Sequence, residues 1–106
     1  MQTTEALRDA LRHQANVEFP AAAKAGNYPI RLNHCFLRVV YDNLFGQQWQ
    51  EVLAKGKPAI RQLTEAQLEA ALAIGQRVID DKEICVRLNR RSLDWRGKEG
   101  PKAARK

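Results

Sequence analysis

Cysteine, histidine and long apolar runs are all scarce in this sequence. It has two cysteines and two histidines in 106 residues. Two thiols are too few for the disulfide scaffold of small secreted domains. Cys35 and Cys85 each lie in an apolar helical pattern, so we expect both to be reduced and buried. The longest apolar stretches fall well short of the roughly 20 residues that a membrane-spanning helix needs, and we expect no membrane partner.

The chain also lacks the short motifs that mark common enzymes and metal sites. It contains no CxxC, HExxH or GxSxG and no glycine-rich phosphate loop. No spacing pre-assembles any two of its four candidate metal ligands, which are His13, His34, Cys35 and Cys85. A Cys35 nucleophile with His34 as its base is disfavoured, because successive helical residues diverge by about 100°, although His13 can approach from another helix. The sequence predicts no metal, no cofactor and a noncatalytic protein, with an enzyme of an unfamiliar type as the alternative.

What the chain does have is a strongly uneven charge. Residues 1–81 carry nine Lys/Arg and nine Asp/Glu, whereas residues 82–106 carry nine Lys/Arg and three acids, which gives the whole net charge of +6. A neutral body with a cationic end is typical of a surface that binds a polyanion. The first residues carry an acid and no basic cluster before an apolar run, unlike a secretory signal, so the sequence predicts a cytoplasmic location.

Length and apolar periodicity predict a single all-α domain. A chain of 106 residues has room for one modest core, and 44% apolar with 28% charged residues is close to the average of soluble globular proteins. We expect a small bundle of four to five helices over residues 1–97. Residues 98–106 contain no large apolar side chain and should form a flexible basic tail.

The first half of the chain predicts two helices joined by a connector. Thr3 or Thr4 can cap the first helix, and Phe19-Pro20 should end it, because proline disrupts the hydrogen bonds of a helix interior. Residues 21–26 then form the connector. The widest apolar stripe in the chain predicts a central helix over residues 33–45, followed by a break or kink at the next glycine.

The second half predicts two more helices in close succession. Thr64 and Gln67 are spaced for a capping box, so a helix should start directly after Thr64. Gly75 lies in the middle of its apolar stripe, which indicates that another backbone approaches there. Asp80-Asp81 indicates that this helix ends there and that the next helix begins directly afterwards. The alternation over residues 84–88 is also compatible with a strand, but one strand would have no mate, so we expect a helix.

The basic C-terminal segment supplies the main candidate site. Arginine suits phosphate oxygens and guanine edges, and a tryptophan can stack on an exposed base. The candidate nucleic-acid-binding residues are Arg87, Arg90, Arg91, Trp95, Arg96 and Lys98. In a helix, Arg87 and Arg91 share one flank. A helix-turn-helix whose second helix carries these arginines is worth testing, although the usual turn glycine is missing.

The basic residues and Trp95 also have simpler structural interpretations. Basic residues are common on solvated helices, and an arginine near a helical C-terminus stabilises the helix dipole. Trp95 either stacks on a base or closes the core of the small domain. Trp49 continues the apolar stripe of the central helix, so we expect it in the core.

Arg31, His34 and Arg38 form a second candidate site, for an anion. Positions 34 and 38 share a helical face, and His34 lies at the expected N-terminus of the central helix, where backbone donors favour phosphate or carboxylate. The alternative is structural. In that case His34 packs at the edge of the core and Arg38 pairs with Asp42, the acid four residues further on.

Together these features predict noncatalytic binding of nucleic acid, either DNA or RNA, through the arginine-rich C-terminal segment. The alternative is an adaptor or inhibitor that docks on an acidic protein surface, or a chain that associates with itself as a homodimer. An exposed apolar patch would favour the adaptor, whereas a continuous basic face would favour nucleic acid.

Overall fold

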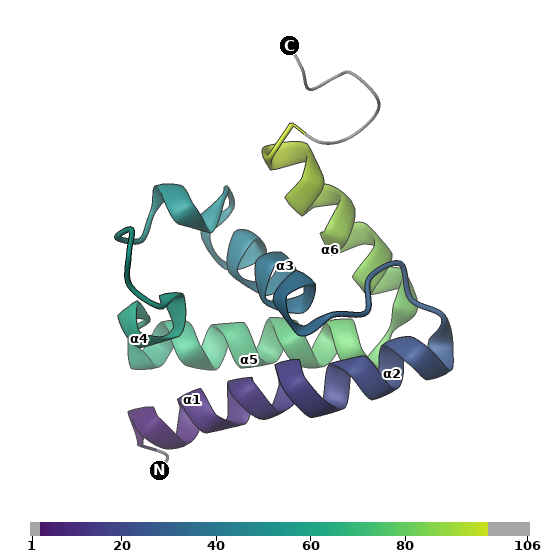
Figure 1. The fold of residues 1–106 in the computed structure, drawn as a ribbon, viewed down its shortest axis with the longest axis horizontal. Helices are drawn as coiled ribbons and strands as arrows, with labels where there is room; N and C mark the ends of the chain where they lie inside the picture. The colour runs from purple at the N-terminus through teal and green to yellow at the C-terminus, as the bar shows by residue number, and fades with distance from the viewer. Residues whose placement is uncertain (1–2, 98–106) are drawn as a thin grey trace.

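The chain is helical along most of its described length. The computed structural model describes residues 3–97, which form five helices and no strand (Figure 1). The first helix is continuous through α1 (Thr4–His13), the π-helical segment η1 (Gln14–Glu18) and α2 (Phe19–Gly26). The other elements are α3 (Asn33–Phe45), the 3-10 turn η2 (Trp49–Glu51), α4 (Ala59–Gln62), α5 (Glu65–Asp80) and α6 (Lys82–Trp95). The all-α prediction is confirmed, and the tail expected over residues 98–106 lies outside the described residues.

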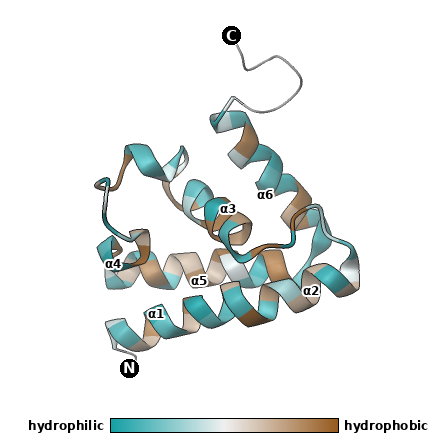
Figure 2. Cartoon of the chain, in the orientation of Figure 1, coloured by the Kyte–Doolittle hydropathy of each residue, from teal (hydrophilic) through white to brown (hydrophobic). Residues whose placement is uncertain are grey.

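Two long helices form the base of the molecule. The first helix and α5 lie side by side and run in the same direction, and α3 packs above them (Figure 1). α6 leaves the end of α5 and packs against both α5 and α3. Apolar and polar residues alternate around these helices, the pattern that lets each bury one face (Figure 2). α6 is therefore held at one end of the bundle with its outer side free of other described helices.

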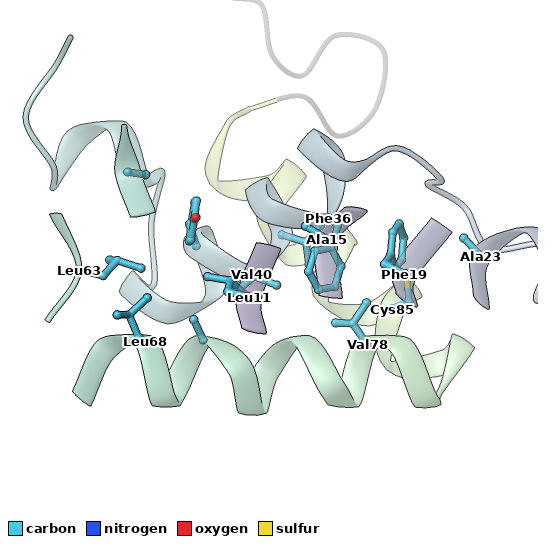
Figure 3. Packing of buried hydrophobic residues seen from close by; sticks show 14 of the residues in the cluster. Leu11, Ala15, Phe19, Ala23, Phe36, Val40, Leu63, Leu68, Val78 and Cys85 are labelled. Atoms are coloured by element: carbon cyan, nitrogen blue, oxygen red, sulfur yellow. The ribbon is translucent and has the colours of Figure 1, made fainter. Parts of the chain in front are cut away.

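The core lies where the first helix, α3 and α5 meet. Phe19 and Phe36 are fully buried and stack with ring centroids 4.8 Å apart. Figure 3 shows both rings among the packed core residues. Leu11, Leu68 and Val78 complete this layer and are also fully buried. Burial of a large apolar side chain contributes about 1.5–3 kcal/mol, so these contacts from three helices define how the bundle closes.

Phe19-Pro20 does not end the first helix, and the predicted connector over residues 21–26 is wrong. In η1 the turn widens, and the Phe19 N–H donates to the carbonyl of Gln14, five residues earlier. Pro20 then falls in the first turn of α2, where a missing N–H costs little. The alanines that follow are the best helix formers, so the helix runs on to Gly26.

The other predicted boundaries are confirmed. Gly46 ends α3 in the left-handed conformation, with φ of 71°. Thr64 forms the capping box with Gln67 at the start of α5, and both hydrogen bonds of the box are present. Asp81 separates α5 from α6 and accepts a bond from the Glu83 N–H. Residues 84–88 are helical, as expected.

Gly75 lies at a point of close approach, as its place in the stripe predicts. A Cβ built there would lie 2.3 Å from Oε1 of Gln14 and 2.9 Å from Cζ of Phe36. The approaching atoms belong to side chains rather than to another backbone, which corrects the detail of the prediction. Gln14 is itself buried and donates from Nε2 to the Leu72 carbonyl, so it helps to join η1 to α5.

We expect Gly75→Ala to lower the free energy of unfolding by about 1–3 kcal/mol, because overpacking outweighs the better helix propensity of alanine. Urea denaturation measures the change. Ala70→Gly, at an exposed position of α5, is the control for propensity alone and should cost about 1 kcal/mol. A Gly75→Ala protein more stable than the parent by about 1 kcal/mol, the full gain in helix propensity, would show that Gln14 and Phe36 move aside without cost.

Candidate functional site

The outer side of α6 carries three of the candidate residues at a regular spacing. Arg87, Arg91 and Trp95 follow one another at four-residue intervals, which places them on one flank of the helix. All three are exposed, Trp95 to 36%. We call these three residues the α6 stripe. It spans about 12 Å along the helix and presents two guanidinium groups and one indole ring to solvent.

Trp95 does not close the core, so that interpretation is wrong. The buried side of α6 carries Cys85 and Ser92, which are fully buried, whereas Trp95 is 36% exposed and is not part of the core cluster. Trp49, in contrast, packs against the core as expected, with its ring edge-on to Tyr41 at a centroid distance of 5.8 Å.

Acidic residues interrupt the basic surface of α6. Glu83 is exposed four residues before Arg87, and Asp94 is exposed three residues after Arg91. Arg90 is exposed as well but is engaged in an interaction of its own. The described part of α6 is therefore a mixed surface on which the α6 stripe is the most regular basic feature. Lys98 lies outside the described residues.

Arg96 is turned inward, toward a buried carboxylate. Its Nε donates to Oδ2 of Asp42 at 2.7 Å and its Nη2 donates to Oδ1 at 2.9 Å, so the pair is bidentate. Asp42 is fully buried, and the Arg96 side chain is only 12% exposed. Such a pair is stronger and more directional than a single charged hydrogen bond. The Arg96 guanidinium is bonded within the chain, unlike the exposed side chains of Arg87 and Arg91.

Further donors complete the surroundings of the Asp42 carboxylate. The Ser92 hydroxyl donates to Oδ2 at 2.6 Å, and the backbone N–H of Trp49 donates to Oδ1 at 2.9 Å. Ser92 in turn accepts a bond from Nη1 of Arg38, at 2.7 Å. We call Asp42, Ser92, Arg96, Arg38 and the Trp49 amide the Asp42 network. It ties α6 to α3 and to η2.

Sequence reasoning missed this network because its polar residues look like solvated helix faces. The alternative of an Arg38–Asp42 pair is corrected by the structure: Asp42 is bonded to Arg96, while Arg38 donates to Ser92 and Asn89. One signal was present. The spacing of Asn89, Ser92 and Arg96 gives α6 a polar strip at helical period. Arg38 and Asp42 give α3 a matching strip.

The second candidate site is divided by the structure. His34 and Arg38 line a cavity of about 450 Å³ between α1, α3 and the η2–α4 segment. Arg31 is not among the lining residues and donates instead to the side-chain oxygen of Asn27. Two of the three predicted residues therefore come together.

The two thiols form no disulfide with each other. Cys35 and Cys85 are both free, as expected, with Cys85 fully buried and Cys35 partly buried. Burial raises the pKa of Cys85 to about 11, so its thiol is protonated. Within residues 3–97 no group of three His, Cys, Asp or Glu side chains could hold a metal ion. His13 lies against Glu18, with Nδ1 2.9 Å from Oε2.

The described residues thus offer an exposed basic stripe on α6 and a cavity beside Arg38, joined through the Asp42 network. No helix between residues 3 and 97 has the length and apolar character to cross a bilayer. In comparisons with family models, curated proteins and solved structures, nothing matches this chain.

Proposed function

We propose that the protein binds nucleic acid without catalysing a reaction, and that the α6 stripe is the contact surface. The observation that carries the proposal is the exposure of Arg87, Arg91 and Trp95 in one line. The guanidinium groups suit phosphate oxygens, and the indole ring suits the face of a base. Trp95 is 36% exposed, so part of its ring is open to a stacking partner beside the two arginines.

The spacing of the stripe fits a polynucleotide backbone. Successive stripe residues are about 6 Å apart along the helix axis, close to twice the roughly 3.4 Å by which the charges of one strand are spaced along the axis of a duplex. Stacking on Trp95 needs the open face of a base, which single strands and strand ends offer more readily than a duplex. We therefore expect single-stranded nucleic acid to bind best.

Two further features support this use of α6. The Asp42 network fixes α6 against α3, so the stripe is held in place before a ligand arrives, which reduces the entropic cost of binding. The sequence of residues 98–106 adds positive charge, which strengthens long-range attraction to a polyanion. Its basic residues are Lys98, Lys102, Arg105 and Lys106, against the single acid Glu99.

The proposal predicts that Arg87→Gln/Arg91→Gln weakens binding to single-stranded DNA and RNA at least tenfold. Fluorescence anisotropy across a salt series measures the affinity, and the slope of log affinity against log salt should become shallower by roughly one per arginine removed. Trp95→Ala should weaken binding while leaving that slope unchanged, because stacking releases no counterions.

The matched control is Arg61→Gln/Arg77→Gln. Both residues are exposed, on α4 and α5, and their loss changes the net charge by the same amount. If both double variants weakened nucleic-acid binding equally, the loss of affinity would come from net charge alone, and a site on α6 would be refuted. Dissociation constants above about 100 μM at low salt for duplex DNA, single-stranded DNA and RNA alike would end the nucleic-acid proposal.

An exposed apolar patch would favour the adaptor alternative, just as a continuous basic face, which Glu83 and Asp94 interrupt on α6, would favour nucleic acid. The exposed large apolar residues other than Trp95 belong to separate segments, namely Val17 in η1, Leu32 before α3, Val52 after η2 and Val86 in α6. The adaptor would be favoured if this chain bound an acidic protein through Arg87 and Arg91 and showed no affinity for nucleic acid.

A further inference from the structure

The cavity beside Arg38 has the composition of a small-molecule site rather than of a packing defect. Its volume of about 450 Å³ falls within the range of roughly 300–1,000 Å³ typical of ligand pockets. Most of its wall is apolar, formed by Leu37, Tyr41, Trp49, Pro58, Ala59 and Ile60. Ligand pockets typically combine such walls with a few polar groups that fix the orientation of the ligand.

The charged groups of this cavity are all of one sign. These groups are Arg12 and Arg38, and no acidic residue is among the lining residues. Tyr41 adds no negative charge, because burial raises its pKa to about 12. Arg12 shares its charge with Asp9, whose Oδ1 is 2.8 Å away, at the exposed surface of α1. Arg38 is therefore the stronger candidate for meeting an anion inside the cavity.

Arg38 is held in position by neutral partners. Its Nη1 donates to Ser92 at 2.7 Å and its Nη2 donates to Asn89 at 2.8 Å. These bonds fix the guanidinium plane without an acid that directly satisfies its charge, and they use two of its five donors. The Trp49 side of the cavity is also fixed by a hydrogen bond, because the backbone N–H of Trp49 donates to Oδ1 of Asp42. Two sides of the cavity thus owe their geometry to the Asp42 network.

We propose that this cavity binds a free amphipathic carboxylate, with the carboxylate on the Arg38 side and an apolar body against the apolar wall. A carboxylate matches the planar fork of arginine. The apolar side chains outnumber the basic ones in the lining, which favours a ligand with one charged end over a polyanion. This activity is separate from the proposed contact of α6 with nucleic acid.

Trp49 provides a direct readout of binding. The chain has two tryptophans, so Trp95→Phe leaves Trp49 as the sole indole, and Trp49 lines the cavity. Octanoate, octan-1-ol and octylammonium serve as probes with the same alkyl chain and different charge, below their micellar concentrations. We expect saturable changes in Trp49 emission with octanoate, at least tenfold weaker binding of octan-1-ol, and no saturable binding of octylammonium.

Variants locate the site. In the Trp95→Phe background, Arg38→Gln should weaken octanoate binding about tenfold while leaving octan-1-ol binding unchanged, and Arg12→Gln should give a smaller loss. Arg12 lies outside the Asp42 network, so this variant keeps the test valid if Arg38→Gln fails to fold. Ile60→Phe should weaken both ligands, because a larger ring fills the cavity. Arg77→Gln, exposed on α5, is the matched control and should change neither.

Three results would overturn the proposal. The first is the absence of saturable octanoate binding. The second is equal affinity for octanoate and octan-1-ol, which would remove the role of the basic residues. The third is a response to vesicles of phosphatidylcholine and phosphatidylglycerol without a response to free octanoate, which would assign the cavity to a lipid surface instead.

Discussion

Replacing Asp42 with alanine is expected to lower the free energy of unfolding by about 3–5 kcal/mol, as is typical when one partner of a buried ion pair is removed. The carboxylate is fully buried and accepts bonds from Arg96, Ser92 and the Trp49 N–H. Without it, the Arg96 guanidinium stays largely out of water with no opposite charge. Small domains have total stabilities of about 5–15 kcal/mol, so this single change should remove a large fraction.

Chemical denaturation of matched variants tests this expectation. Asp9→Ala removes another carboxylate that pairs with an arginine, Arg12, but at an exposed position, and should cost no more than about 1 kcal/mol. The double variant Asp42→Ala/Arg96→Ala should be less destabilised than the sum of its single changes, because it leaves no unpaired charge. A loss for Asp42→Ala as small as that for Asp9→Ala would show that the network contributes little to stability.

The network also links the two proposals. Its members hold α6, which carries the stripe, and they hold Arg38 and Trp49, which line the cavity. Asp42→Ala should therefore disturb both surfaces together, whereas the changes at Arg87 and Arg91 should leave the cavity intact. Comparing these variants distinguishes residues that contact a ligand, such as Arg87 and Arg91, from Asp42, which holds other residues in place.

Helix boundaries that depend on neighbouring residues could be predicted from the sequence. The capping box of Thr64 and Gln67, the left-handed Gly46 and the acidic Asp81 each act within one turn, so the information lies in the local sequence. The error at Pro20 has a local cause of another kind. A π-helical segment, rare in proteins, moves the proline to a position where a helix tolerates it.

The candidate site was less predictable, because its geometry depends on contacts between distant residues. Periodicity indicates that Arg87, Arg91 and Arg96 belong to one helix, but it does not show which side of that helix faces α3. The orientation of the helix is fixed by the bond between Arg96 and Asp42, which are 54 positions apart in the sequence. The cavity likewise takes its walls from the first helix, α3 and the η2–α4 segment, and only the fold brings Arg12 to Arg38 and Ile60.

Phe36→Ala is expected to lower the free energy of unfolding by about 3–5 kcal/mol, the usual cost of truncating a buried aromatic ring. Phe36 is fully buried, stacks on Phe19, and lies close to Gly75. It therefore contacts all three helices that meet in the core. Thermal and urea unfolding measure the change, with Leu32→Ala as the control, because Leu32 is exposed and its loss should cost about 0.5 kcal/mol or less.

The same position allows a sharper test of close packing. The methyl group of Gly75→Ala competes for space with the Phe36 ring and the Gln14 amide. Truncation of Phe36 removes one of these neighbours and opens a cavity into which the Gln14 amide can relax, so Gly75→Ala should cost less in the Phe36→Ala background by at least about 0.5 kcal/mol. Additive losses would show that the Gln14 amide alone opposes the methyl group. A Phe36→Ala loss no larger than that of Leu32→Ala would mean that the three helices are held together elsewhere.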